Sequence, residues 1–451
     1  MLVYFRAENF RSIKEPIELD LRAAPRLRRL KGHVRTPAND KSLKLLKSAV
    51  LYGANASGKS NILKAIRFAQ QMVTGHVIPN APIASEPFAL TENVTEESSF
   101  YFEFVLVETV FGFGIRCNEE RILEENLIAY TETEDLCLYS RTHIDKENYQ
   151  IETSFFDKES TAEKIELEFL IKYTPKNRLF ILECEERGGF DKLPTIGTNI
   201  QNVYIFFQHY LIIIFPETKS GDFYHSLYNK KETTTQLSNL LNSLDTGVAG
   251  FTHIQISSSL FGASVISQAH EKLLNNKELL ISFHHENKQY YATLDSDKKI
   301  SFFRIKTVHK LPSGTNAQLE LTQESDGTLR LLDLLPIISE EAIDKQATTF
   351  LIDEFDRSLH PNLAKAFLNL FLNSEHSDND NQLIVSTHEA ELLDNDLLRR
   401  DEIWFVQKEW DSASRLYCLN DYSTRFDKDI HKAYLSGKFG AVPILMDEFK
   451  K

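Results

Sequence analysis

The chain shows three kinds of hydrophobic pattern in its first 130 residues. Residues 1–21 alternate apolar and polar positions in "VYFRAENF" and "IELDL", which predicts the two strands of a hairpin. Residues 99–130 show the same alternation and predict further antiparallel strands. In contrast, "SAVLYG" (48–53) is almost wholly apolar, as in a parallel strand buried on both faces. Residues 59–73 then place apolar side chains at helical spacing.

The C-terminal third alternates between helical and strand patterns. "DGTLRLLDLLPIISEEA" (326–342) and "PNLAKAFLNLFLN" (361–373) predict helices, and "TTFLIDE" (348–354) and "QLIVSTH" (382–388) predict buried strands. This order is typical of a parallel sheet with helices on its faces, so we expect an α/β fold.

The middle of the chain has the weakest pattern. Helical pieces such as "QLSNLLNSL" and "SQAHEKLLN" predict a mostly helical insertion over 176–280, an arm or lid. The most apolar run, 203–215, is shorter than the about 20 residues of a membrane span and includes Gln208 and His209. We therefore expect this run to be buried core or a packed arm. The chain as a whole is predicted to have three segments, 1–175, 176–280 and 281–451.

Composition narrows the class of protein. Apolar residues make up 42% of the chain, enough for a core, which excludes a disordered protein. The N-terminus carries charges in its first eight residues and no apolar signal core. The four cysteines are too far apart for a zinc ribbon or a disulfide framework, which suits a reducing cytoplasm: Cys117, Cys137, Cys184 and Cys418.

Charge is distributed unevenly. The net charge of −14 argues against a constitutive nucleic-acid binder. Residues 22–47, however, hold nine basic residues and one acid, Asp40. They form either a solvated face or a contact for a nucleic-acid backbone. The nine are Arg22, Arg26, Arg28, Arg29, Lys31, Arg35, Lys41, Lys44 and Lys47.

A loop of small residues follows the predicted strand at 48–53. "GANASGKS" matches G-x-x-x-x-G-K-[ST], and it lies between an apolar strand and an amphipathic helix, as a phosphate-binding loop requires. Gly53 and Gly58 allow close backbone approach, Lys59 would reach the β- and γ-phosphates, and Ser60 would ligate Mg²⁺. The predicted nucleotide-binding residues here are Gly53, Ala54, Asn55, Ala56, Ser57, Gly58, Lys59, Ser60 and Asn61.

Two acids end the predicted strand at 348–354. A carboxylate at the C-terminal edge of a parallel sheet is where the metal of such a site is held. We expect Asp353 to hold Mg²⁺ and Glu354 to polarise the attacking water. No N-K-x-D guanine motif is found, which favours ATP over GTP.

Two further elements complete the predicted site. His388 ends the next apolar strand, where an imidazole can bond a γ-phosphate or the catalytic water. Ser325 and Gly327 stand just before a helix, whose N-terminus can bind an anion. They form either an ordinary N-cap or a second phosphate site that serves the nucleotide of another subunit.

The order "GANASGKS", "ESDGT", "LIDEFDRSLHP", "STH" resembles the ABC-type ATPase head of chromosome-structure, recombination and OLD-type ATPases. The resemblance implies a head with an N-terminal antiparallel β lobe, and two ATPs sandwiched between two heads. It assigns Ser325 and Gly327 to the signature loop, Asp356 to the D-loop and His388 to the switch position. It also makes Arg11, in "ENFRSI", part of the nucleotide site.

The chain most resembles a bacterial group of AAA/ABC-like ATPases that includes abortive-infection proteins, and its tail over 399–443 looks like that group's ending. The resemblance implies anti-phage defence beside a separately encoded nuclease or toxin. It also implies a homodimer or a multiple of dimers, with ATP and Mg²⁺ as cofactors and no membrane contact.

Several features depart from the family pattern. No Q-loop glutamine is found, and "SDGT" lacks the glutamine of the common "SGGQ", which predicts slow turnover. These departures leave an alternative open, a regulatory scaffold that holds ATP without hydrolysing it and restrains an effector. A metal nuclease is a weaker alternative, because the carboxylates that could form its site lie in polar loops: Asp378, Asp380, Asp394 and Asp396.

Overall fold

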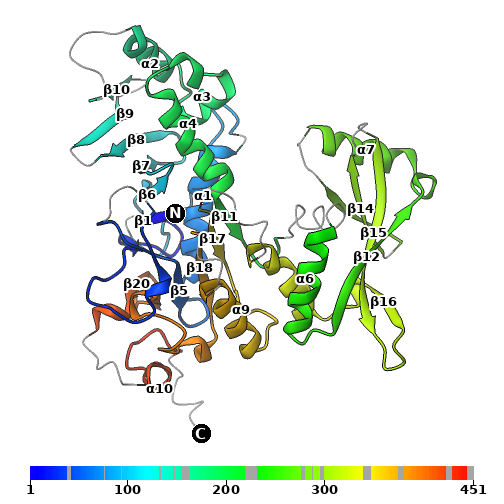
Figure 1. The fold of residues 1–451 in the computed structure, drawn as a ribbon. Coiled ribbons are helices and arrows are strands. Elements are labelled where there is room, and N and C mark those ends of the chain that lie inside the picture. The colour runs from blue at the N-terminus through cyan, green and yellow to red at the C-terminus, as the bar shows by residue number, and fades with distance from the viewer. Residues whose placement is uncertain are drawn as a thin grey trace. The chain divides into compact units, whose positions relative to one another are not determined.

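The structure is a computed structural model with two compact units (Figure 1). The first unit comprises Met1–Phe215, Asp344–Phe355 and Leu372–Lys451, and the second comprises Pro216–Ile343 and Asp356–Phe371. The residues that the structure describes are 1–37, 42–75, 77–92, 94–131, 134–145, 148–154, 162–218, 231–275, 280–286, 288–294, 299–338, 347–373, 380–422 and 429–443.

A six-stranded sheet carries the predicted buried strands in the first unit. Five strands are parallel, and the last forms an antiparallel hairpin with its neighbour. All residues of the three middle strands are buried, which explains their continuous apolar pattern. The order is β11 (Leu211–Ile214), β17 (Thr349–Ile352), β18 (Gln382–Thr387), β5 (Ser48–Tyr52), β19 (Ile403–Lys408) and β20 (Ser414–Cys418).

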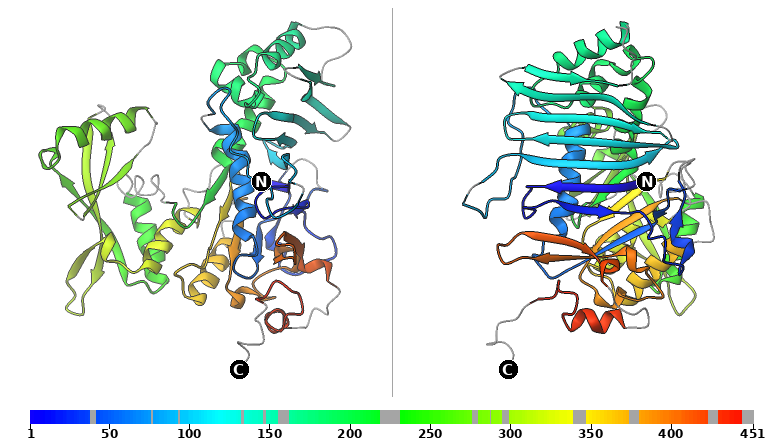
Figure 2. Two further views of the ribbon diagram at one scale, coloured as in Figure 1. Left: turned by 180° about the vertical axis from the view of Figure 1, so that it is seen from behind. Right: turned by 90° about the vertical axis from the view of Figure 1, so that its left-hand side faces the viewer.

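A seven-stranded antiparallel sheet forms the second layer of this unit, and its strands lie side by side in the right-hand view of Figure 2. It confirms the predicted N-terminal hairpin and the predicted strands over 99–130. Its order is β10 (Asn148–Glu152), β9 (Asp135–Asp145), β8 (Ile122–Tyr130), β7 (Thr109–Cys117), β6 (Ser98–Leu106), β1 (Leu2–Glu8) and β2 (Ile17–Asp20). The α/β fold with an antiparallel N-terminal lobe is therefore confirmed.

Helix α1 (Lys59–Thr74) packs between the two sheets. Ile62 and Ile66 are fully buried and belong to one core that includes Phe102 of the antiparallel sheet and Leu351 of the parallel sheet. At the other end of the helix, Gln70 Nε2 donates to backbone oxygens of the segment that leads into β11, at 2.6 and 2.7 Å. The C-terminal part of α1 is thereby bonded to the edge of the parallel sheet.

The boundary of the first unit differs from the one predicted at residue 175. The first unit continues through α2 (Ala162–Lys172), α3 (Phe180–Arg187) and α4 (Gly197–Ile205) to Phe215. The apolar run at 203–215 is not a separate arm, because Phe206 and Phe207 enter the core and β11 pairs with β17.

The second unit contains an antiparallel sheet, whereas the sequence predicts a mostly helical insertion over 176–280. Helices do predominate among the described residues of 176–280. The strand at 300–310, however, pairs with the strand at 248–256, and three further strands between 281 and 320 join the same sheet. Its strands are β12 (Val248–Ile256), β13 (Ile281–His285), β14 (Lys288–Leu294), β15 (Ile300–Lys310) and β16 (Asn316–Glu320). Its helices include α6 (Lys231–Ser243), α7 (Ala263–Asn275), α8 (Asp326–Leu334) and most of α9 (Pro361–Asn373).

Three smaller findings bear on the sequence predictions. The helix predicted over 326–342 ends at Leu334 and continues as a 3₁₀ turn to Ile338, because Pro336 has no N–H to donate. None of the described helices is long and apolar enough to cross a membrane. The four cysteines are free.

Candidate functional site

The loop between β5 and α1 is held close to its neighbours. Ala56 and Gly58 have positive φ values of 60° and 106°, a backbone conformation that glycine adopts most easily. A Cβ atom on Gly53 would lie 2.7 Å from Ser57 Oγ, and one on Gly58 would lie 2.7 Å from Ser12 Oγ. Side chains at these two glycines would therefore distort the loop, as the sequence motif predicts.

The N-terminus of α1 fits a phosphate group. No side chain caps it, so the first N–H groups of the helix have no partner from a capping side chain. The helix dipole places partial positive charge at the same point. A concavity of N–H groups at a helix start is an anion site, and phosphate matches it in charge and hydrogen bonding.

Lys59 crosses the inside of this loop. Its side chain is buried, and its ammonium donates to the backbone oxygens of Gly53 at 2.7 Å and Ala54 at 3.1 Å. The same Nζ atom lies 3.1 Å from Nδ1 of His388, at the end of β18. The predicted lysine and the predicted histidine are thus in direct contact.

Three oxygens meet beside the lysine. Ser60 Oγ donates to Asp353 Oδ1 at 3.1 Å, and Ser386 Oγ donates to the same oxygen at 2.5 Å. Asp353 is 3% exposed. A hydroxyl and a carboxylate at this spacing are oxygen ligands of the kind that Mg²⁺ prefers, so the residues fit the predicted metal.

Glu354 has a strained backbone. Its φ of 46° is in the left-handed region, which a non-glycine residue rarely occupies. Ser386 holds it there, because its Oγ accepts from the Glu354 N–H at 2.9 Å and its carbonyl accepts from the Phe355 N–H at 2.9 Å. Strain of this kind is concentrated at functional sites. Ser386 was not predicted from the sequence, although "VSTH" carries polar residues at a strand end.

A second group of hydroxyls fixes the other side of the loop and was also missed. Ser414 Oγ, at the start of β20, donates to the carbonyl of Ser57 at 2.7 Å and lies 2.7 Å from Ser12 Oγ. Ser12 Oγ accepts from Asn61 Nδ2 at 2.8 Å. Arg11, predicted to touch the nucleotide, is bonded to the Glu86 carboxylate at 2.6 Å.

The predicted signature residues lie in the second unit. Ser325 is the N-cap of α8 and accepts from the Thr328 N–H at 3.1 Å. A Cβ on Gly327 would lie 2.7 Å from the carbonyl oxygen of Ser358, so this position requires glycine. Glu324 anchors the loop to β15, because its carboxylate lies 2.7 Å from Nε2 of His309. The structure thus brings Lys59, Ser60, Asp353, Glu354 and His388 together in one unit, and Ser325 and Gly327 in the other.

Three of the basic side chains in 22–47 pair with acids of the first unit. Arg22 pairs with Asp20 and Glu103, Arg29 with Asp396, and Arg35 with Asp380. Lys47 is buried, which lowers the pKa of its ammonium to about 8; the nearby Arg35 adds to this effect, and Asp380 and Glu402 oppose it. Lys41 and Asp40 lie outside the described residues.

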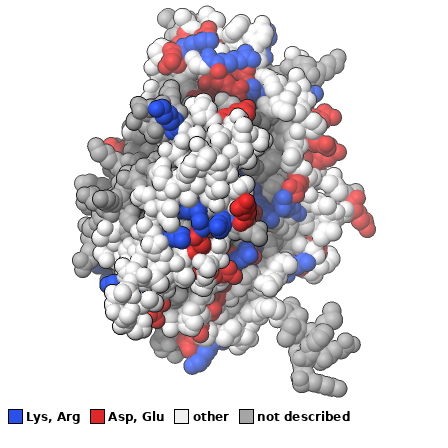
Figure 3. Space-filling view, turned by 90° about the vertical axis from the view of Figure 1, so that its right-hand side faces the viewer, with Lys and Arg blue, Asp and Glu red and all other residues white. Residues whose placement is uncertain are grey.

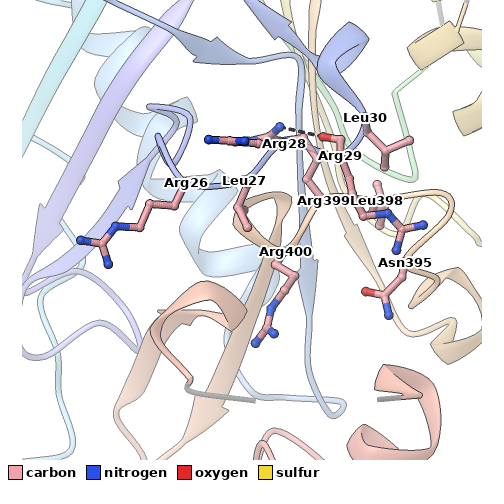
Figure 4. Close-up of a pocket in the computed structure, with 9 residues that line it drawn as sticks. All are labelled: Arg26, Leu27, Arg28, Arg29, Leu30, Asn395, Leu398, Arg399 and Arg400. Atoms are coloured by element: carbon pink, nitrogen blue, oxygen red, sulfur yellow. Dashed lines mark hydrogen bonds between the residues drawn. The ribbon is translucent and has the colours of Figure 1, made fainter. Parts of the chain in front are cut away.

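Five arginines of this unit surround a cavity of about 240 Å³ (Figure 4). Three of them are already bonded. Arg399 binds both carboxylate oxygens of Asp401, at 2.7 and 2.9 Å, and Arg29 pairs with Asp396. Arg400 donates to the carbonyl oxygens of Leu419 and Tyr422, at 3.3 and 3.0 Å. Arg26 and Arg28 are exposed at the cavity.

On the face drawn in Figure 3, basic and acidic side chains are mixed, without a large area of either sign among the residues described there.

The described carboxylates of the proposed nuclease cluster have local partners. Asp380 and Asp396 are in ion pairs, and Asp394 Oδ1 accepts from the Asp396 N–H at 2.9 Å. Asp378 lies outside the described residues. Within the part of the chain that the structure describes, no three His, Cys, Asp or Glu side chains are grouped to hold a metal. The predicted surface loop remains the better interpretation.

The parallel sheet, the phosphate loop and the two carboxylates define a P-loop nucleotide-binding protein of the ATPase class. Residues 48–190 and 196–394 match the protein family described as "AAA domain, putative AbiEii toxin, Type IV TA system", and the chain belongs to this family. The resemblance to AAA/ABC-type ATPases linked to abortive infection is confirmed. A search of curated proteins gave no match.

Two solved structures resemble the chain at low identity. One is described as "Crystal structure of the SmcHead bound to the C-winged helix domain of ScpA"; it is 13% identical, with 92% of this chain and 97% of that chain covered and a TM-score of 0.40. The other is the SMC head domain from Thermotoga maritima, which is 12% identical, with 92% and 98% covered and a TM-score of 0.35.

Proposed function

We propose that the protein is an ATP-hydrolysing switch of the ABC type, which closes as a dimer on ATP and reopens after hydrolysis. One observation carries this proposal. Lys59, His388, Ser60, Asp353 and Glu354 come from three separate parts of the sequence and meet at one sheet edge, with hydrogen bonds linking the lysine to the histidine and the serine to the aspartate.

Each residue has a role that its position supports. The loop from Gly53 to Asn61 would hold the phosphates through its N–H groups, and Lys59 would bind the β- and γ-phosphates. Ser60 and Asp353 would hold Mg²⁺, which supplies neutralisation of phosphate charge. Glu354 would orient the attacking water and accept its proton, and His388 would donate a hydrogen bond at the γ-phosphate end.

The second unit would supply the signature residues to the nucleotide of another protomer. Ser325 and Gly327 support this role because the Ser325 cap and the close approach of Gly327 to Ser358 hold the start of α8 in one conformation. Arg11 would join the site after its exposed ion pair with Glu86 opens, which costs little. Each site would then be complete only in the dimer.

The biological setting that we propose is bacterial anti-phage defence, with a separately encoded nuclease or toxin as effector. The family description, which includes an abortive-infection toxin and a type IV toxin–antitoxin system, supports this setting. Four free cysteines suit the cytoplasm, where thiols stay reduced.

The decisive experiment uses Glu354→Gln, which keeps the size of the side chain and removes its negative charge. We expect this variant with Mg²⁺ and ATP to double in mass in light scattering, while Lys59→Ala under the same conditions keeps the mass that it has without nucleotide. A Glu354→Gln protein that also keeps its nucleotide-free mass would contradict the dimer switch.

Hydrolysis needs its own measurement. We expect phosphate release by the wild type, with and without double-stranded DNA, and none by Lys59→Ala. The alternative function, a scaffold that holds ATP without hydrolysing it, predicts tight ATP binding and negligible release. Turnover above about one ATP per minute per protomer, although slow for an enzyme, would exclude that alternative.

A further inference from the structure

Trp410 is the most exposed large apolar side chain in the described parts of the chain, at 95%. It lies in the turn 409–413 between β19 and β20. Single exposed apolar residues are common on protein surfaces, so its exposure alone indicates nothing. Its position relative to the phosphate loop is what matters.

Strand register places Trp410 at the sheet edge that carries the loop. β19 runs parallel to β5, and Phe405 pairs with Tyr52, the last residue before the loop. β19 continues for three residues beyond that pair, to Lys408. At about 3.3 Å per residue, the turn with Trp410 therefore extends roughly 10 Å past the point where the phosphate loop begins.

The strand order decides which end of a bound nucleotide faces this turn. β17 and β18, on one side of β5, carry Asp353, Glu354 and His388, whereas β19 and β20 lie on the other side. Lys59 contacts His388, so the γ-phosphate end points toward β18. The loop N–H groups hold the α- and β-phosphates, so the nucleoside leaves on the opposite side, toward the β19–β20 turn.

The β19–β20 turn is bonded to the phosphate loop and to residues 12–14. Ser414, just after the turn, donates to the Ser57 carbonyl, and its N–H donates to the Ser12 carbonyl, both at 2.7 Å. Asp411, next to Trp410, pairs with Lys14 at 2.8 Å. The bond to Ser57 holds the turn against the phosphate loop, and those to Ser12 and Lys14 hold it against the segment after β1, while the indole itself stays in solvent.

We propose that Trp410 is the stacking surface for the purine base of the nucleotide. This inference rests on the proposed function and adds the part of the site that holds the nucleoside. A planar indole on a fixed turn can stack on the flat face of a base, and stacking of a base on an aromatic side chain contributes substantially to binding.

The test compares the affinities of three proteins for Mg²⁺–ATP and for Mg²⁺–tripolyphosphate, which has the phosphates and no base. Trp410→Ala should bind ATP about tenfold more weakly than the wild type and bind tripolyphosphate equally well. Trp410→Phe should recover most of the ATP affinity. Tyr173→Ala is the matched control, because Tyr173 is also an exposed aromatic residue, at 57%, next to α2 at the far edge of the antiparallel sheet.

Fluorescence gives a second readout. The other tryptophan, Trp404, is 7% exposed, so ATP, but not tripolyphosphate, should quench the emission of Trp410. This quenching should disappear in Trp410→Phe.

The outcomes separate this inference from the proposed function. Equal ATP affinity in Trp410→Ala and the wild type would overturn the stacking role and leave the nucleotide site intact. Loss of tripolyphosphate affinity in Trp410→Ala would also overturn it, because the residue would then support the loop. A wild-type protein that binds neither ligand would overturn both proposals.

Discussion

Ser386 Oγ donates a hydrogen bond to Asp353 Oδ1 at 2.5 Å and accepts one from the Glu354 N–H at 2.9 Å. A single hydroxyl on β18 thus fixes the carboxylate that is proposed to hold the metal and the backbone of the proposed base. Because Ser386 is fully buried, water cannot replace these bonds easily.

We expect Ser386→Ala to reduce the rate of ATP hydrolysis by about fivefold to thirtyfold, since it removes two hydrogen bonds, each worth about 1 kcal/mol. ATP affinity should change little, because Lys59 and the loop remain. Steady-state phosphate release over a range of ATP and Mg²⁺ concentrations would measure both quantities. Ser436→Ala, which removes a hydroxyl that donates to the Ala433 carbonyl in α10 (Ile430–Leu435), should behave as the wild type. A Ser386→Ala enzyme with unchanged kcat would show that Asp353 and Glu354 are positioned without this hydroxyl.

Gly327→Ala should destabilise the second unit by about 1–3 kcal/mol, because its Cβ would lie 2.7 Å from the Ser358 carbonyl oxygen. Denaturant unfolding followed by circular dichroism would measure the loss. Gly262→Ala is the control in the same unit, where the nearest atom to an added Cβ is 4.0 Å away. Equal stability of the two variants would mean that the loop around Ser358 moves away without cost.

Arg28→Glu should weaken DNA binding by residues 22–47. The slope of log affinity against log salt concentration should become shallower by about one for each phosphate contact that is lost. Arg29→Glu should have a larger structural effect, because it also places a second carboxylate beside Asp396, the present partner of Arg29. Fluorescence anisotropy with labelled duplex at several salt concentrations would measure the DNA affinity and the salt dependence of both variants. Lys172→Glu, an exposed charge reversal in α2, is the control. Binding unaffected by Arg28→Glu would assign this basic segment to a solvated face.

Lys47→Met should stabilise the protein in a pH-dependent way. Burial lowers the pKa of Lys47 to about 8 in the folded state, from an ordinary value of 10.5. The folded protein therefore holds a buried charge below pH 8, and this cost is relieved as the pH rises from 8 toward 10.5, where the unfolded chain binds more protons. The advantage of Lys47→Met should be largest at pH 7 and shrink by pH 10. Unfolding free energies of the wild type and the variant at these two pH values would measure it. The exposed Lys44→Met should give a difference that does not change with pH.

The parts of the fold that the sequence predicts well are those with strong local patterns. β5, α1, β17 and β18 are recognised from apolar runs and helical spacing, and their order implies a parallel sheet. Asp353 and His388 could be assigned to one site because the C-terminal ends of parallel strands share one edge. Contacts such as those of Ser386 and Ser414 could not, because they depend on which strands are neighbours.

The division of the chain into two units is harder to predict from the sequence, because it too depends on which strands pair. β11 is a short apolar segment far from β17 in sequence, and only pairing in three dimensions shows that it belongs to the central sheet. Likewise, apolar and polar positions alternate along β13 to β16 as they do in the strands of any antiparallel sheet. Their membership of the second unit follows from the pairing of β15 with β12.

The neighbouring positions of β11 and β17 have a consequence for how the chain connects its two units. The chain passes from the first unit to the second directly after Phe215 and again directly after Phe355, one residue beyond the end of β11 and three beyond the end of β17. Both exits thus start from adjacent strands at the edge that carries Asp353 and Glu354. These two connections to the second unit are therefore covalent continuations of the strands that border the proposed metal site.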